Sequence, residues 1–206
     1  GGGHSTEYFL YYVEVQQSLG EEYPRSSYWV LLTRDVLPGS RGKSYTAQQA
    51  LVAQQSSSIN HPPYELPHAL EAATAILSHY VHSGNRLYAG DTDGAPSTST
   101  RCAELLEDAA GNKSAVTVGR FCTRGLVLLS GFDDEAEFGV SCLRPFGTRS
   151  YRSSALLDSI GAEEWHQYFG EVGEAPPLPA HIIDTLNSPC PFWADRKIKD
   201  THLLVL

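Results

Sequence analysis

The residues best suited to chemistry lie in "FDDEAEFGV", residues 132–140, where Glu135 and Glu137 are one residue apart on a predicted short strand. Alternate residues of a strand share a face, so the two carboxylates lie side by side. A carboxylate beside a sugar can stabilise the cation-like centre that develops as an N-glycosidic bond breaks. The same letters, preceded by Asp133 and Asp134, also fit the solvated acidic tip of a hairpin. The sequence favours the hairpin tip and leaves the catalytic interpretation open.

Two stretches upstream of this pair contain further polar residues. The predicted buried strand "YWVLLT" is followed directly by Arg34, and "PSTSTR" contains Ser97, Thr98 and Ser99. An arginine at a strand end, then a Ser-Thr-Ser run, then Glu-x-Glu is the order found in arginine-type ADP-ribosyltransferases. To this extent the sequence resembles that family.

The resemblance implies a role for each of these residues. Arg34, or Arg86 in "RLYAG", would bind a phosphate of NAD through its planar guanidinium, and the Ser/Thr run would brace the site. Glu137 would stabilise the ribose cation, and Glu135 would position the attacking nucleophile. NAD is the cofactor expected under this interpretation, and no cofactor is expected otherwise.

Three longer stretches resemble segments of a bacterial domain of unknown function: "SYWVLLTRDVLPGSRGKSY", "LEAATAILSHYV" and "DTHLLVL". In that domain the stretch ending "DTHLLVL" precedes the one beginning "GGGH". The chain also contains no methionine. We therefore expect a processed, trimmed or permuted chain, and a secreted or processed origin rather than a cytoplasmic one.

Histidine and cysteine offer two weaker sites. His68, His79 and His82 fall on one arc of a predicted helix, but at a rise of 1.5 Å per residue the first two are about 16 Å apart, too far to share a metal ion. No metal site is therefore predicted.

The four cysteines, which include Cys190 in "SPCPFW", form no Cys-x-x-Cys pair. They are compatible either with two disulfides or with buried free thiols.

Composition restricts the classes of partner. The formal net charge is −9 with only 15 Lys and Arg, so general nucleic-acid binding is not expected. A bilayer span requires about 20 consecutive apolar residues, and no apolar run approaches this length. The hydrophobic fraction of 41% is sufficient for an ordinary core.

The pattern of predicted elements indicates an α+β fold, a single domain over residues 1–206 with an antiparallel sheet or meander and several packed helices. The predicted helices are "STEYFLYYVEVQQSLG", "TAQQALVAQQ" with a capping box from Thr46 to Gln49, residues 67–83, "RCAELLEDAAG", "AEEWHQYFG" and "AHIIDTLN". The predicted strands are "YWVLLT", the start of "NRLYAG", "SAVTVGRFC", "GLVLLSG", "AEFGVSCL" and "THLLVL", of which the third to fifth would be antiparallel neighbours.

The helix over residues 67–83 is the clearest element. Its expected buried arc consists of Leu70, Ala73, Leu77, Tyr80 and Val81. The histidines, Glu71, Ala72 and Ala75 fall on the opposite arc, which is expected to face solvent.

Two functions are compatible with this sequence. The first is a recognition module for an unidentified protein or small-molecule ligand, because the 11 tyrosines and the Ser/Thr-rich loops suit a binding surface. The alternative is a toxin-like enzyme that cleaves an N-glycosidic bond, either of NAD or between a nucleic-acid base and its sugar.

Overall fold

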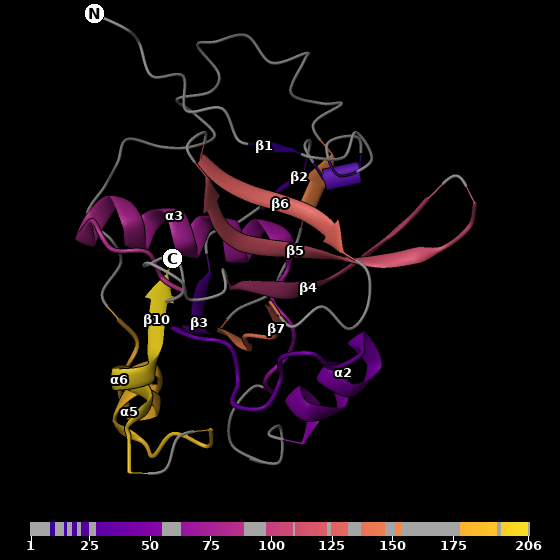
Figure 1. Cartoon of the computed structure of the whole chain (residues 1–206). Coiled ribbons are helices and arrows are strands. Elements are labelled where there is room, and N and C mark those ends of the chain that lie inside the picture. The colour runs from indigo at the N-terminus through magenta and orange to yellow at the C-terminus, as the bar shows by residue number, and fades with distance from the viewer. Residues whose placement is uncertain are drawn as a thin grey trace, which may run out of the picture.

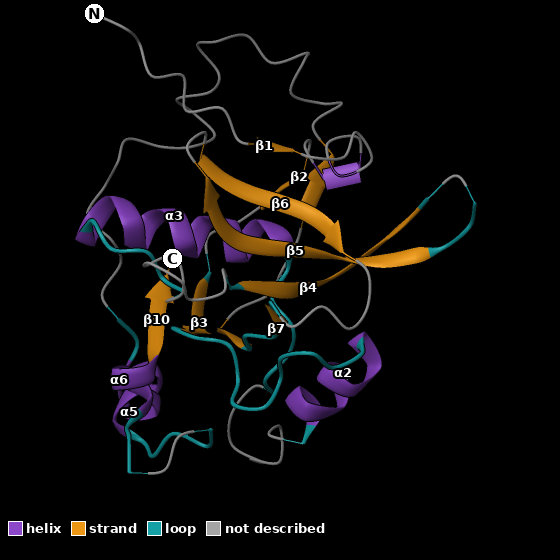
Figure 2. Ribbon diagram, viewed as in Figure 1, coloured by secondary structure: helices purple, strands orange, loops and turns teal. Residues whose placement is uncertain are grey.

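The computed structural model describes residues 9–10, 15, 18–19, 22–24, 28–54, 63–88, 98–108, 110–122, 125–131, 137–146, 151–153, 178–192 and 195–205. The fold is α+β, as predicted. A twisted five-stranded sheet packs against one long helix, and a three-stranded sheet lies beside it with two short helices at its end (Figures 1 and 2). None of the helices in the described residues has the length and apolar character of a membrane-spanning segment.

The five-stranded sheet is mixed rather than a pure meander. Its order is β1 (Phe9–Leu10), β6 (Gly125–Gly131), β5 (Lys113–Cys122), β4 (Ser99–Glu107) and β7 (Phe138–Gly139). The predicted antiparallel pairing holds for β5 and β6. It is wrong for the third run, because β7 pairs in parallel with β4 at the far edge of the sheet. The pattern of apolar residues marks a strand but does not select its neighbour.

The three-stranded sheet has the order β10 (His202–Val205), β3 (Trp29–Thr33) and β8 (Leu143–Phe146), all antiparallel. Its two faces belong to different cores. Val30, Leu32 and Leu143 belong to the same core as the long helix, whereas Leu31 packs on the face that holds Cys190 and Ile198. The expected strand "THLLVL" is therefore confirmed, and it pairs with β3. A further two-stranded sheet joins β2 (Glu22–Pro24) to β9 (Tyr151–Ser153).

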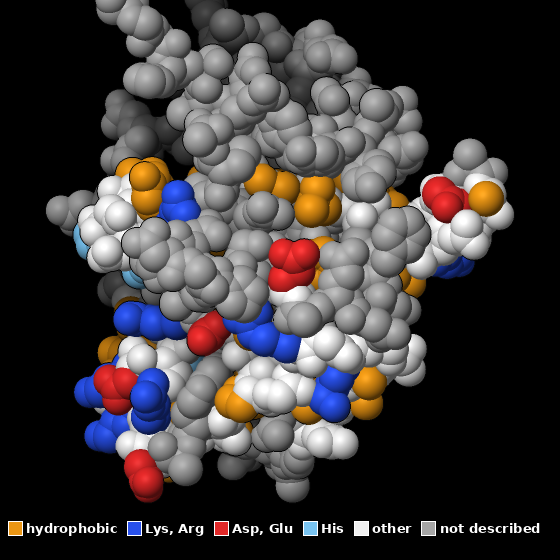
Figure 3. Space-filling view, viewed as in Figure 1, with side chains coloured by type: hydrophobic (Ala, Val, Ile, Leu, Met, Phe, Trp, Pro, Cys, Tyr) orange, Lys and Arg blue, Asp and Glu red, His pale blue; other side chains and the backbone are white. Residues whose placement is uncertain are grey.

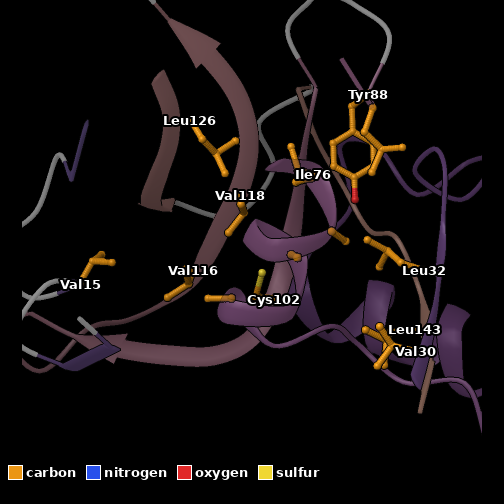
Figure 4. Close-up of a cluster of buried hydrophobic side chains, with 14 of the residues drawn as sticks. Val15, Val30, Leu32, Ile76, Tyr88, Cys102, Val116, Val118, Leu126 and Leu143 are labelled. Carbon is orange, nitrogen blue, oxygen red and sulfur yellow. The ribbon is translucent and has the colours of Figure 1, made fainter. Parts of the chain in front are cut away.

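Helix α3 (Ala69–Ser83) ends at Gly84 in the left-handed conformation, as the sequence predicted, but the predicted buried face is only partly correct. Ala73 and Leu77 are partly buried against the core, whereas Tyr80 is 43% exposed. The buried positions of α3 are Ala69, Glu71, Ala72, Ala75 and Ile76. Val81, expected in the core, is 83% exposed. Alanines allow the helix backbone to approach β4 and β5 closely, and Figure 4 shows Ile76 beside Val118 and Cys102 in this core.

The buried carboxylate of Glu71 is compensated by the start of α3. It accepts hydrogen bonds from the His68 backbone N–H (2.9 Å) and from the Tyr28 hydroxyl (2.8 Å). Glu104 of β4 lies 2.9 Å from His68 Nδ1 and accepts from the Ala69 N–H. His68 is therefore the N-cap residue of α3, and the carboxylates of Glu71 and Glu104 satisfy the first N–H groups of the helix.

Other local predictions had mixed outcomes. The stretch "RCAELLEDAAG" was predicted as a helix, yet residues 101–107 belong to β4, because pairing with β5 overrides the helical propensity of Glu and Leu. Helix α2 (Tyr45–Ala53) is capped by Ser44 rather than Thr46. Leu87 and Tyr88 form a bend instead of a strand.

The C-terminal part contains α5 (Ala180–Asn187), as predicted, and α6 (Ile198–Thr201), which was not predicted. In the N-terminal stretch predicted as a helix, Phe9–Leu10 is a strand and residues 15, 18 and 19 are helical. The predicted helix "AEEWHQYFG" lies outside the described residues.

Candidate functional site

The parallel pairing of β4 with β7 brings the Ser/Thr run next to the acidic pair. Ser99 lies opposite Phe138 in the register, and the Ser99 N–H donates to the Glu137 carbonyl at 3.3 Å. Thr98 and Ser99 are buried, and Glu137 is half-buried. Two further predicted site residues, Ser97 and Glu135, lie outside the described residues.

The loop that joins β3 to α2 crosses this edge of the sheet. The Leu37 N–H donates to the Val140 carbonyl (2.8 Å), and the Val140 N–H donates to the Ser40 hydroxyl (3.1 Å). Gly139 allows the close approach, since a Cβ atom there would lie only 2.6 Å from the Cβ of Val36. The loop is thereby held against β7 and Val140.

The same loop brings Arg41 to the Ser/Thr run. One terminal nitrogen of Arg41, Nη2, donates to the Thr98 hydroxyl. The other, Nη1, is buried and has no hydrogen-bond partner among the described residues. Sequence reasoning missed Arg41, although "RDVLPGSRGKSY" contains a second arginine seven residues after Arg34. Only the folded loop shows which arginine reaches the Ser/Thr run.

A second arginine, Arg101 of β4, fixes this part of the structure from within. Its side chain is fully buried, and its Nη1 donates to the Lys43 carbonyl (2.7 Å) and to Oε1 of Gln48 (3.1 Å). Its guanidinium carbon lies 5.6 Å from the centre of the Phe138 ring. The Gln48 amide in turn donates to the carbonyls of Ser40 and Phe138. Arg101 and Gln48 thus connect the loop between β3 and α2, the helix α2 itself and strand β7.

Three buried hydroxyl groups lie beside this edge, on β4 and on the segments near it. The Thr100 and Ser141 oxygens are 2.8 Å apart, and the Tyr88 hydroxyl donates to that of Ser141 at 3.1 Å. Burial raises the pKa of Tyr88, so its phenol stays protonated and acts as a donor. This network connects the start of β4 to Ser141, which lies between β7 and β8.

Arg34 and Arg86, the two arginines to which the resemblance assigns phosphate binding, lie in other parts of the structure. Arg34 is exposed and holds the end of β3 to the end of α6 and to β10: its backbone N–H donates to the Thr201 carbonyl (2.8 Å) and its Nε to the His202 carbonyl (3.2 Å). Arg86 is exposed in the bend after α3. The arginine that contacts the Ser/Thr run is Arg41.

The three cysteines whose side chains are described are unsuited to nucleophilic chemistry. Cys102, Cys142 and Cys190 are buried free thiols, so two disulfides do not form. Burial raises the pKa of Cys102 and of Cys142, which keeps both in the unreactive thiol form. Among the described residues no cluster of three or more His, Cys, Asp or Glu could hold a metal ion.

No protein-family model, curated protein or solved structure matches this chain. The face seen in Figure 3 contributes one observation: although the chain is acidic overall, Lys and Arg side chains gather in the lower part of this face. Local positive charge of this kind attracts anions even when the net charge is negative.

Proposed function

We propose that the chain is a recognition module that binds the anionic group of a small-molecule ligand at the edge formed by β4 and β7. The observation that carries the proposal is the guanidinium of Arg41, held by Thr98 through Nη2 while Nη1 is buried without a described partner. A planar guanidinium with one nitrogen fixed by a hydrogen bond and the other without an acceptor matches an oxyanion.

Energetics support a ligand at this position. A buried N–H group without an acceptor costs about 1–3 kcal/mol, and more when the group is charged. A phosphate or carboxylate oxygen that accepted from Nη1 would remove this cost. The guanidinium is pre-oriented by Thr98 and by the loop that Arg101 and Gln48 hold, so little conformational entropy would be lost on binding.

The alternative is an enzyme that cleaves the N-glycosidic bond of NAD. The parallel strand pairing favours it, because Ser99 and Glu137 become neighbours, as expected from the resemblance to arginine-type ADP-ribosyltransferases. In this alternative Arg41 would take the phosphate-binding role that the resemblance assigns to Arg34. Glu137 would then stabilise the ribose cation as nicotinamide leaves.

The binding test uses ADP-ribose, NAD and inorganic phosphate as probes, with calorimetry at fixed ionic strength. Arg41→Gln should weaken the binding of ADP-ribose at least tenfold. Lys43→Gln is the matched control: it removes a positive charge from an exposed side chain two residues away and should leave the affinity within about twofold. Equal affinity of native protein and Arg41→Gln would refute the proposal.

The enzyme alternative is tested by the release of nicotinamide from NAD, measured by mass spectrometry. Release that is lost in Glu137→Gln and kept in Glu107→Gln, an exposed glutamate at the far end of β4, would favour the enzyme. Binding of ADP-ribose that depends on Arg41, with no release of nicotinamide from NAD, would favour the recognition module.

A further inference from the structure

The described residues between 178 and 205 form one segment, made of α5, α6 and β10, which we refer to as the C-terminal segment. Its strand pairing with other described parts of the chain is that of β10 with β3. Its buried side chains Cys190 and Ile198 pack with Leu31 of β3. Strand β3 also pairs with β8 on its other side. The segment can therefore separate from β3 while the pairing of β3 with β8 is kept.

His202 is buried where this segment meets the rest of the fold, with 2% of the residue exposed. Its Nδ1 lies 3.2 Å from the Ile198 carbonyl, and its Nε2 lies 3.3 Å from the Tyr64 hydroxyl. A carbonyl only accepts, so Nδ1 carries the proton and Nε2 accepts from Tyr64. An imidazolium donates from both nitrogens. Protonation therefore reverses the bond to Tyr64, whose own proton then has to turn away.

The charged groups nearest to His202 are cationic. Arg34, at the end of β3, donates from Nε to the His202 carbonyl at 3.2 Å. Arg144 of β8 places its guanidinium carbon 4.0 Å from the centre of the Tyr64 ring, which lies 5.7 Å from the His202 ring. The charged side chains at the start of the segment's last helix are exposed; they are Lys197, Lys199 and Asp200. A protonated His202 would thus add a third positive charge next to two arginines.

The uncharged groups around the ring do not offset this charge. Tyr64 stays a neutral phenol because burial raises its pKa, and Cys142, close to Tyr64, stays a thiol for the same reason. Among the described residues the ion pair that is found joins His68 to Glu104, far from this ring in the sequence. A buried cation without an acidic partner is costly, and the cost disappears when the imidazolium becomes hydrated.

From the buried imidazole, the hydrogen bonds that require its neutral form and the two neighbouring arginines, we infer that His202 is an acid-sensitive switch: protonation of its ring releases the C-terminal segment from β3. Separation of the segment gives the imidazolium access to water. The core between α3 and the five-stranded sheet contains no described residue of this segment, so it stays folded. Release uncovers Cys190, whereas Cys102 stays buried in that core.

The direction of the switch follows from proton binding. The pKa of His202 is about 4 in the closed state, mainly because of burial, with a contribution from Arg144 and Arg34. In the released state we expect the ordinary value of about 6.5. Release is therefore least populated above pH 6.5 and increases as the pH falls toward 4. At pH 5 the equilibrium constant for release should be about 25-fold larger than at pH 7.5.

Thiol labelling measures this release. Brief exposure to 4,4′-dithiodipyridine, which reacts with thiols at acid as well as neutral pH, is followed by mass spectrometry of the peptides. Each labelling rate is divided by that of the same cysteine in denatured protein at the same pH. The corrected rate of Cys190 should rise about 25-fold between pH 7.5 and pH 5, and that of Cys102 should change less than about threefold.

Two variants assign the response to His202. The amide of His202→Gln does not titrate, so this variant should lose the pH dependence of Cys190 labelling, whatever its rate at pH 7.5. His181→Gln is the matched control, because His181 is an exposed histidine of α5 in the same segment, and this variant should keep the native response. Hydrogen exchange of native protein, corrected for the intrinsic rate at each pH, needs no variant: at pH 5 the amides of β10 should lose protection and those of β4 and β5 should keep it.

Four outcomes would overturn the inference. Equal rises for Cys190 and Cys102 would mean that acid unfolds the whole described fold, and no rise for Cys190 would mean that the segment stays closed. A rise that persists in His202→Gln, or that is lost in His181→Gln, would assign the response to another group. The measurements use no ligand, so their result is independent of binding at the edge formed by β4 and β7.

Discussion

The hydroxyl of Tyr64 lies 3.3 Å from Nε2 of His202, although the two residues are 138 positions apart in the sequence. The other ring nitrogen of His202, Nδ1, lies 2.9 Å from the Thr201 hydroxyl and 3.2 Å from the Ile198 carbonyl. A carbonyl can only accept, so Nδ1 carries the proton and Nε2 accepts from the tyrosine. His202 is therefore held as a buried neutral imidazole where β10 begins.

This arrangement predicts acid sensitivity. The pKa of His202 is lowered to about 4. Burial is the main cause, and the positive charges of the nearby Arg144 and Arg34 contribute to the same shift. The unfolded chain binds the proton near pH 6.5, so the stability from this group is fully present above that pH and decreases as the pH falls from 6.5 toward 4. The loss should reach about 3 kcal/mol.

Urea unfolding of native protein and of His202→Asn at pH 7 and pH 4.5 measures this effect. Carboxylates titrate in the same range, so the quantity of interest is the difference between the two proteins. The variant should be less stable at pH 7 and should lose less stability on acidification. An equal loss in both proteins would show that His202 is not the group responsible.

Helix α3 predicts a clear ranking of one core and one surface substitution. Ile76→Ala removes a fully buried side chain between α3 and the five-stranded sheet and should cost about 2–5 kcal/mol. Val81→Ala changes an exposed position and should lie within about 0.5 kcal/mol of native protein. Chemical denaturation gives both values, and the opposite ranking would mean that α3 packs through its leucine face.

The contact between Gly139 and Val36 predicts a coupled pair. Gly139→Ala would place a Cβ 2.6 Å from the Cβ of Val36 and should cost about 1–3 kcal/mol. The same substitution in a Val36→Ala background should cost less, because the contacts at 2.7 and 2.8 Å with the two Cγ atoms of Val36 are then removed and only the Cβ contact stays. A double-mutant cycle of unfolding free energies measures this coupling. Additive effects would indicate that the loop does not pack on β7 as described.

The buried thiols predict a difference between folded and unfolded protein in reaction with Ellman's reagent. Cys102, Cys142 and Cys190 should react slowly in native protein, because burial excludes the reagent and raises the pKa of the first two. In denaturant without reductant at least three thiols should titrate. Fewer than three would show that one of these residues is oxidised.

Part of the candidate site could be predicted from the sequence. The resemblance places the Ser/Thr run and the Glu-x-Glu pair in one site, and the pairing of β4 with β7 puts Ser99 beside Glu137, whereas the role of these residues stays a prediction. The arginine could not be chosen, because nothing in the order of residues shows how a loop crosses a strand. Arg41 reaches Thr98 because Gly139 leaves room for Val36 and because Arg101 holds the loop at Lys43.

The sequence by itself determined the α+β class and the existence of β3, α3, α5 and β10, because apolar runs, a helix-ending glycine and turn residues act over a few neighbouring positions. Only the tertiary structure decided which face of α3 is buried, that residues 101–107 form a strand, and that β7 lies parallel to β4. The physical reason is competition between partners. A stretch that can be helix or strand, or that can bury either of two faces, adopts the state in which distant segments best satisfy its hydrogen bonds and cover its apolar surface.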